Sequence, residues 1–149
     1  MVTLYGFPYS NYYNIVKHVL LQKGIPFEER LVYPKTAELL AVNPVSKVPA
    51  LTTENGVHLS ESSVLADYLE EAYPQNPLYP ESPEQRAQVR RIMKLAELYI
   101  ELPARRLLPV VLGKMPADEL MKKEVRYALK KGLAALGALS SLSPYIAAT

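Results

Sequence analysis

Ser10 is the first residue whose type and position suit a chemical role. It stands in Tyr9-Ser10-Asn11, between a predicted strand and a predicted helix, where serine is a common N-cap residue. A helix N-terminus attracts anions through its free N–H groups and its dipole, and a hydroxyl there can also donate a hydrogen bond to a thiolate. Two roles therefore remain open for Ser10: an ordinary cap and a group that stabilises an anion.

Val48-Pro49 opens a predicted strand. Proline does not fit the interior of a sheet, so it marks either the first position of a strand or a cis peptide bond. A cis bond would turn the N–H and C=O of Val48 away from the neighbouring strand, where they can pair with a peptide-like ligand. An ordinary trans proline at a strand start is the alternative.

Glu61-Ser62-Ser63 stands at the start of another predicted helix. Serine residues at such a place usually cap the helix, which is one interpretation. In the other, the hydroxyl and the N–H of Ser62 bind an α-carboxylate, and the carboxylate of Glu61 faces the adjacent ammonium group. An acidic side chain beside an anion site suits a zwitterionic ligand.

Composition limits the chemistry further. The chain of 149 residues contains no cysteine, and its 17 basic and 15 acidic side chains give a net charge of +2. Disulfides, zinc–thiolate sites and a thiol–disulfide oxidoreductase of the thioredoxin type are thereby excluded, so a reacting sulfur must belong to a bound molecule. The small, mixed charge argues against nucleic acid or an anionic membrane as the main partner. We recognise neither a membrane span nor a signal peptide.

Short segments of alternating type must position the three features. In chain order they are strands over residues 2–6 and 27–32 around a helix over 14–23, a short helix over 36–42, a hairpin of 48–53 and 57–59, and a helix over 62–72. Asn-Gly between the two hairpin runs favours a tight turn, and a βαβ unit implies parallel strands. The order βαβ-α-ββα predicts an α/β domain over residues 1–75 with a mixed four-stranded sheet. In its last helix we expect Val64 and Leu65 on the apolar face.

Prolines separate this domain from the rest of the chain. Pro74, Pro77, Pro80 and Pro83 recur at every third position, which blocks helix and sheet alike. Residues 76–83 are therefore predicted to form a linker.

Residues 84–149 carry only helical patterns. Apolar residues at three- and four-residue steps predict one amphipathic helix over 83–113, bent or ended in its far half by two prolines, and a second that begins near residue 116 or 117. Two helices make a poor domain alone. We therefore expect an all-α domain that is incomplete within this sequence.

The sequence at this point resembles the cytosolic glutathione S-transferases of the serine type, theta- or zeta-like or bacterial. The similarity lies in the order of the elements, the absence of cysteine from the start, Val48-Pro49-Ala50-Leu51, Glu61-Ser62-Ser63 and the proline-rich segment. It is closest over the first 80 residues. The resemblance implies a thioredoxin-like domain followed by an all-α domain, a homodimer and a cytoplasmic location.

The resemblance also assigns roles to single residues. Ser10 matches the serine that activates the thiol of glutathione, with Tyr9 as the alternative because some classes use a tyrosine. Val48 matches the residue whose backbone pairs with the cysteinyl part of glutathione, and Pro49 matches the family's cis-proline.

Four further positions match the parts of the family that hold the two ends of glutathione. Glu61 and Ser62 match the pair that holds the γ-glutamyl end. Lys47 stands where a glutamine or lysine often meets the glycyl carboxylate, and Lys35 is a weaker candidate for the same role.

A transferase of the detoxifying kind is the function that the resemblance implies. Glutathione would be the co-substrate, and its thiolate would attack a small hydrophobic electrophile without a metal ion. The alternative is a non-catalytic binding or interaction module with the same fold.

Overall fold

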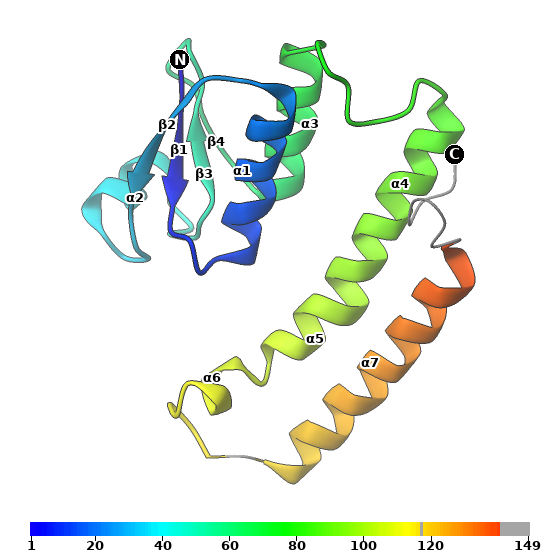
Figure 1. The fold of residues 1–149 in the computed structure, drawn as a ribbon. Coiled ribbons are helices and arrows are strands. Elements are labelled where there is room, and N and C mark those ends of the chain that lie inside the picture. Colours follow the sequence, from blue (N-terminus) through cyan, green and yellow to red (C-terminus); the bar gives the residue numbers. More distant parts are fainter. Residues whose placement is uncertain (117, 141–149) are drawn as a thin grey trace. The chain divides into compact units, whose positions relative to one another are not determined.

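A computed structural model of the chain describes residues 1–116 and 118–140 (Figure 1). It divides into two compact units, Met1–Leu78 and Tyr79–Thr149. The boundary falls inside the proline-rich segment. Across the described ranges, no helix combines the length and the apolar character that a membrane span requires.

The first unit is built on a mixed sheet of four strands in the order β2-β1-β3-β4 (Figure 1). β1 (Val2–Gly6) pairs in parallel with β2 (Phe27–Leu31) and antiparallel with β3 (Ala50–Thr52). β3 pairs antiparallel with the edge strand β4 (His58–Ser60). The predicted order of elements and the mixed sheet are confirmed.

Three helices accompany the sheet: α1 (Asn11–Lys23), α2 (Ala37–Val42) and α3 (Ser62–Ala72). The main core is made of Val2, Leu4, Tyr13, Val16, Leu20, Ile25, Leu51, Leu65 and Leu69. A smaller cluster comprises Val32, Leu39 and Ala50. Because Ala50 and Leu51 are neighbours in β3 and belong to different clusters, the two clusters lie on opposite faces of the sheet.

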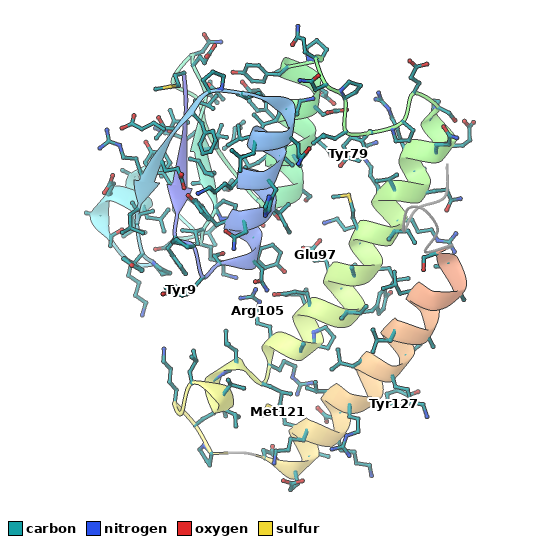
Figure 2. The ribbon with its side chains drawn as sticks, in the orientation of Figure 1. Tyr9, Tyr79, Glu97, Arg105, Met121 and Tyr127 are labelled. Atoms are coloured by element: carbon teal, nitrogen blue, oxygen red, sulfur yellow. The ribbon has the colours of Figure 1, made fainter. Side chains whose placement is uncertain are left out.

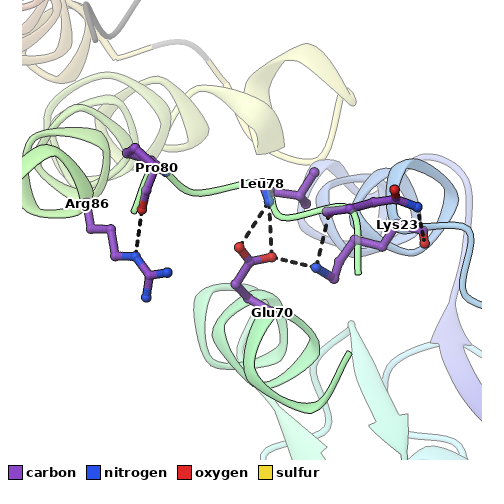
Figure 3. A network of polar contacts seen from close by, with 6 residues as sticks. Lys23, Glu70, Leu78, Pro80 and Arg86 are labelled. Atoms are coloured by element: carbon purple, nitrogen blue, oxygen red, sulfur yellow. Dashed lines mark hydrogen bonds and ion pairs between the residues drawn. The ribbon is translucent and has the colours of Figure 1, made fainter. Parts of the chain in front are cut away.

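A buried ion pair joins α1 to α3 at the far end of α1. The ammonium of Lys23 donates to Glu70 Oε2 at 2.6 Å, and the two side chains are 0% and 8% exposed. Lys23 Nζ also reaches the carbonyl of Asn76 at 3.3 Å, and the carboxylate of Glu70 accepts the N–H of Leu78 at 3.0 Å. Figure 3 shows this network, whose hydrogen bonds join residues 76–78, after α3, to Lys23 of α1 and Glu70 of α3.

Several details of the first unit differ from the prediction. The strands predicted over residues 48–53 and 57–59 are Ala50–Thr52 and His58–Ser60. α1 begins at Asn11, three residues earlier than the apolar periodicity indicated, because the side chain of Ser10 caps it. The apolar face predicted for α3 is wrong at Val64, which is 50% exposed. The buried face of α3 includes Glu70 instead, because Lys23 neutralises its charge.

The described part of the second unit is helical. α4 (Pro83–Ala96) continues through a π-helical turn, η1 (Glu97–Glu101), into the short α5 (Leu102–Arg105), and α6 (Leu108–Val111) follows. The last described helix is α7 (Glu119–Leu139). The predicted break in the far half of the helix over residues 83–113 is confirmed, because prolines stand near the starts of α5 and α6 and remove backbone donors.

α7 approaches η1 closely at Gly132. A Cβ atom at Gly132 would clash with the backbone carbonyl of Tyr99, so only glycine permits this spacing. Val125, which is fully buried, lies on the same helix.

Candidate functional site

The start of α1 follows directly from the end of β1. Ser10 adopts an extended conformation as the N-cap of α1, and its Oγ accepts the N–H of Tyr13 at 3.3 Å. Its own N–H donates to the carbonyl of Phe7 at 3.1 Å. In the part of the chain that the structure describes, the Ser10 hydroxyl has no acceptor for its proton. The same hydroxyl can therefore cap the helix and still donate to a ligand.

Tyr9, the alternative to Ser10, lies one residue outside the helix. Its side chain is 90% exposed, and Figure 2 labels it on the segment that joins β1 to α1. Ser10, by contrast, is half-buried and tied to the helix terminus. The helix dipole and the free N–H groups act on an anion beside Ser10 more directly than on one beside the tip of an exposed tyrosine.

Tyr13 fills the space behind the first turn of α1. Its ring is 3% exposed and contacts Gly6 so closely that a Cβ atom there would clash with it. Its phenol donates a hydrogen bond to Glu29 of β2, and Lys17 Nζ binds the same carboxylate at 2.8 Å. No local motif in the sequence marks this cluster, because its members belong to different elements.

These contacts shift two pKa values in opposite directions. Burial, followed by the hydrogen bond and the charge of Glu29, raises the pKa of Tyr13 well above its ordinary range. Lys17 and then the Tyr13 phenol hold the pKa of Glu29 below its ordinary value. Tyr13 is therefore a neutral donor and Glu29 an ionised acceptor at neutral pH.

The peptide bond Val48-Pro49 is cis. It precedes β3, and Val48 packs against the smaller core cluster. Among the described residues, no hydrogen bond joins the N–H or the C=O of Val48 to another group. These two backbone groups are available to a ligand that aligns beside the start of β3.

Asn43, another residue that the sequence analysis missed, organises the loop that leads to Val48. It is buried, and its side chain donates to the carbonyl of Lys47 at 2.8 Å and accepts the N–H of Val45 at 3.2 Å. Its carbonyl accepts the N–H of Ser46 at 2.8 Å. A buried amide with all these partners fixes the path of the backbone up to the cis bond.

The two lysines singled out from the sequence lie in adjacent loops. Ser46 Oγ accepts the N–H of Lys35 at 2.6 Å, which joins the loop after β2 to the loop before β3. Lys35 and Ser46 both have positive φ, 70° and 57°. Both Lys35 and Lys47 are exposed, so each ammonium group is accessible to an anion.

α3 begins differently from the other long helices. Ser10, Ser82 and Asp118 each cap a helix with a side-chain oxygen, whereas Glu61 makes no such bond. Glu61 has φ 71° and ψ 116°, an uncommon conformation for a residue with a side chain. Strained backbone of this kind is concentrated at functional sites. The side chain of Glu61 therefore does not cap the N-terminus of α3, whose first residue is Ser62.

The sheet register brings these features together. Tyr5 pairs with Ala50, and Ala50 pairs with Ser60. The connection from β1 to Ser10, the Val48-Pro49 pair before β3 and Glu61 after β4 therefore leave the sheet at the same end. β2 is parallel to β1 and ends beside Gly6, so the loop that carries Lys35 starts there too.

The site is rich in hydroxyl, backbone and ammonium groups. In the described ranges, no group of three histidine, cysteine or carboxylate residues has the arrangement of metal ligands. Chemically, this end of the sheet offers two helix N-termini for negative charge, an open backbone for a peptide and lysines for a further carboxylate.

The fold is that of a thioredoxin-like domain, and the three motifs singled out from the sequence lie at one end of its sheet. Residues 4–77 match the family model of the glutathione S-transferase N-terminal domain. A glutathione S-transferase from Pseudomonas putida is 45% identical over 148 residues, which make up 99% of this chain and 67% of that protein. The chain belongs to the glutathione S-transferase family.

Two further similarities bear on function. A stringent starvation protein A homolog from Haemophilus ducreyi is 31% identical over 136 residues, 90% of this chain and 60% of that protein. The crystal structure of a glutathione transferase family member from Pseudomonas fluorescens Pf-5 with bound glutathione matches with a TM-score of 0.80 and 27% identity, over 93% of this chain and 71% of that one. The chain thus spans about two thirds of the length of these relatives.

Proposed function

We propose that this protein is a glutathione transferase. It binds glutathione at the end of the sheet shared by Ser10, Val48-Pro49 and Glu61 and presents it as a thiolate to a small hydrophobic electrophile. The single observation that carries the proposal is the convergence of Ser10, Val48 and Ser62 at one end of the sheet. Membership of the family and the glutathione-bound relative support it.

Each part of glutathione has a proposed partner. The N–H and C=O of Val48, next to Pro49, pair with the cysteinyl residue as a short added strand. The N-terminus of α3 at Ser62 binds the α-carboxylate of the γ-glutamyl end, and Glu61 faces its ammonium group. Lys47, with Lys35 in second place, binds the glycyl carboxylate.

Ser10 is the proposed activating residue. A free thiol has a pKa of about 8.5, so only a few per cent is ionised at pH 7. Lowering that pKa by about two units requires about 2.7 kcal/mol of preferential thiolate stabilisation. A charge-assisted hydrogen bond supplies about 1.5–3 kcal/mol and a helix terminus about 0.3–1 kcal/mol. The Ser10 hydroxyl at the start of α1 is therefore of the right strength.

The chemical step follows from the thiolate. With an aryl halide, the sulfur forms a C–S bond while the C–halogen bond breaks and the halide leaves with its electron pair. The thiol proton is lost to solvent before attack. Ser10 stabilises the anion by donating a hydrogen bond to the sulfur, and it does not need to act as a base.

A non-catalytic binding module is the second candidate. The similarity to a stringent starvation protein A homolog favours it, since that relative does not carry a transferase name. In this case the chain would keep the fold without turnover.

A homodimer and a cytoplasmic location remain expectations from the family; sedimentation and fractionation measure them directly.

The test compares turnover of a chromogenic aryl halide with glutathione in the wild-type protein, Ser10→Ala and Tyr9→Phe. We expect Ser10→Ala to reduce turnover about tenfold to a hundredfold, the loss of one or two pKa units of thiolate stabilisation, and Tyr9→Phe to retain it. Loss in Tyr9→Phe alone would transfer the role to Tyr9. Absence of glutathione binding in the wild type, measured by calorimetry, would favour the interaction module.

A further inference from the structure

We propose that Tyr13 is a positioning residue that aims the hydroxyl of Ser10 toward the bound thiolate. The inference rests on the proposed function, because it assigns Tyr13 a part in thiolate stabilisation through Ser10. Three constraints on Tyr13 carry it: a backbone hydrogen bond to Ser10, a close ring contact with Gly6 and a phenol hydrogen bond to Glu29.

The link to Ser10 is direct. The N–H of Tyr13 donates to Ser10 Oγ at 3.3 Å. A serine oxygen that accepts a hydrogen bond on one side has its own proton directed elsewhere. The position of the Tyr13 amide therefore restricts the directions in which the Ser10 proton can point. A small shift of this amide would turn the hydroxyl relative to the sulfur.

The side chain of Tyr13 holds that amide in place from behind. Its buried ring lies against Gly6, the last residue of β1, so the first turn of α1 cannot slide toward the sheet. Its phenol binds Glu29, whose carboxylate also accepts both 2.8 Å and 2.9 Å hydrogen bonds from Lys17. One residue thus connects β1, β2 and the N-cap of α1.

The charge state of the cluster fits a positioning role. Lys17 on α1 and the Tyr13 phenol face the carboxylate of Glu29, which remains ionised, while burial keeps Tyr13 protonated. The phenol proton is committed to Glu29. Tyr13 therefore does not itself donate to the thiolate, and its influence passes through Ser10.

The experiment measures the ionisation of bound glutathione by thiolate absorbance as a function of pH, in the full chain. Tyr13→Phe keeps the buried ring and removes the bond to Glu29. We expect the apparent pKa of the bound thiol to rise by about half a unit, which lowers the thiolate fraction about threefold at a pH well below that pKa. Glu29→Gln weakens the same bond because it removes the charge of the acceptor, whose side chain is half-exposed. We expect the pKa of the bound thiol to rise in this variant too. Tyr127→Phe, on the exposed face of α7 (Figure 2), should leave it unchanged.

A coupling measurement separates positioning from a merely structural role. If Tyr13 acts through Ser10, Tyr13→Phe has no further effect on the thiol pKa in a Ser10→Ala background. An equal effect in both backgrounds would overturn the proposal, as would an unchanged pKa in Tyr13→Phe and Glu29→Gln while the wild type ionises glutathione. If Tyr13→Phe does not fold, Glu29→Gln decides alone. A wild-type protein that leaves bound glutathione un-ionised would contradict the proposed function itself.

Discussion

The two ends of α1 differ in how completely their polar side chains are hydrogen-bonded to the protein. At the end of the helix, Lys23 has carboxylate and carbonyl partners, and the amide of Asn76 donates back to the carbonyl of Lys23 at 3.2 Å. At the start, Ser10 accepts one hydrogen bond and keeps its proton free of protein acceptors in the described ranges. The end of α1 therefore stabilises the fold, whereas its start retains a hydrogen-bond donor.

Burial explains the contrast. A charge removed from water must be paired, since an unpaired one costs several kcal/mol, and the Lys23 side chain is fully buried. The hydroxyl of Ser10 is neutral and half-buried, so water can complete its bonding at little cost until a ligand displaces it. The fully paired Lys23 thus fixes the end of α1, and the start of the same helix presents the Ser10 hydroxyl as a donor.

Breaking the buried pair should give the largest effect on stability. Lys23→Met leaves Glu70 as a buried carboxylate without its ammonium partner, and we expect the free energy of unfolding to fall by about 3–5 kcal/mol. Urea denaturation followed by circular dichroism measures it. Lys17→Met, which removes the ammonium from an ion pair whose side chains are 34% and 43% exposed, should cost no more than about 1 kcal/mol.

The double variant Lys23→Met/Glu70→Leu makes this test specific. Removing both charges leaves no uncompensated carboxylate, so much of the lost stability should return. A double variant as unstable as Lys23→Met alone would show that the pair is not the cause, and that the backbone bonds of Leu78 and Asn76 dominate this end.

At the other end, Gly6→Ala tests the packing behind the first turn. The added Cβ meets the buried ring of Tyr13, and such overpacking costs about 1–3 kcal/mol. Because the ring must move, we also expect weaker thiolate stabilisation by Ser10. Thermal unfolding and the thiol pKa of bound glutathione report the two effects. Gly137→Ala, which meets no atom within 4 Å, is the control and should not destabilise the protein.

Removing the N-cap of α1 should affect both the stability of the protein and the ionisation of bound glutathione, and a second cap variant separates the two effects. Ser10→Ala deletes the acceptor for the Tyr13 amide, for which we expect about 1 kcal/mol of destabilisation. Ser82 caps α4 in a similar way, accepting the N–H of Gln85 at 3.4 Å, so Ser82→Ala should have a comparable cost. Only Ser10→Ala should also raise the pKa of bound glutathione. Equal effects of both variants on that pKa would reduce Ser10 to an ordinary cap.

The sequence predicted local features well and distant pairings poorly. The bounds of β1 and α3 follow from strand-forming residues, caps and apolar spacing, and they are reproduced. Glu70 was not expected inside, because its partner Lys23 is 47 residues away along the chain and periodicity counts only apolar residues. For the same reason, the apolar pattern placed Val64 on the wrong face.

The candidate site divides in the same manner. Ser10, Val48-Pro49 and Glu61-Ser62 are visible as short motifs, since each occupies a turn or cap with its own local chemistry. Asn43 and Tyr13 look ordinary in the sequence. Their importance depends on the loop that the buried side chain of Asn43 organises and on the strand that supplies Glu29, and only the folded chain defines both.

The last expected effect is confined to alkaline pH. The folded protein holds Tyr13 protonated above its ordinary pKa of about 10, so the stability gained from the neutral phenol is fully present below pH 10. Above that pH the unfolded chain loses this proton while the native state retains it. The free energy of unfolding should then fall by about 1.4 kcal/mol per pH unit for this group.

Tyr13→Phe removes this contribution and leaves those of the other tyrosines. The slope of stability against pH, measured by urea denaturation between about pH 10 and 11, should therefore be shallower in Tyr13→Phe than in the wild type. Tyr127→Phe removes an exposed phenol and should retain the wild-type slope. Identical slopes in all three proteins would mean that Tyr13 ionises as freely as a surface tyrosine, and that the start of α1 is held by ring packing against Gly6 without the bond to Glu29.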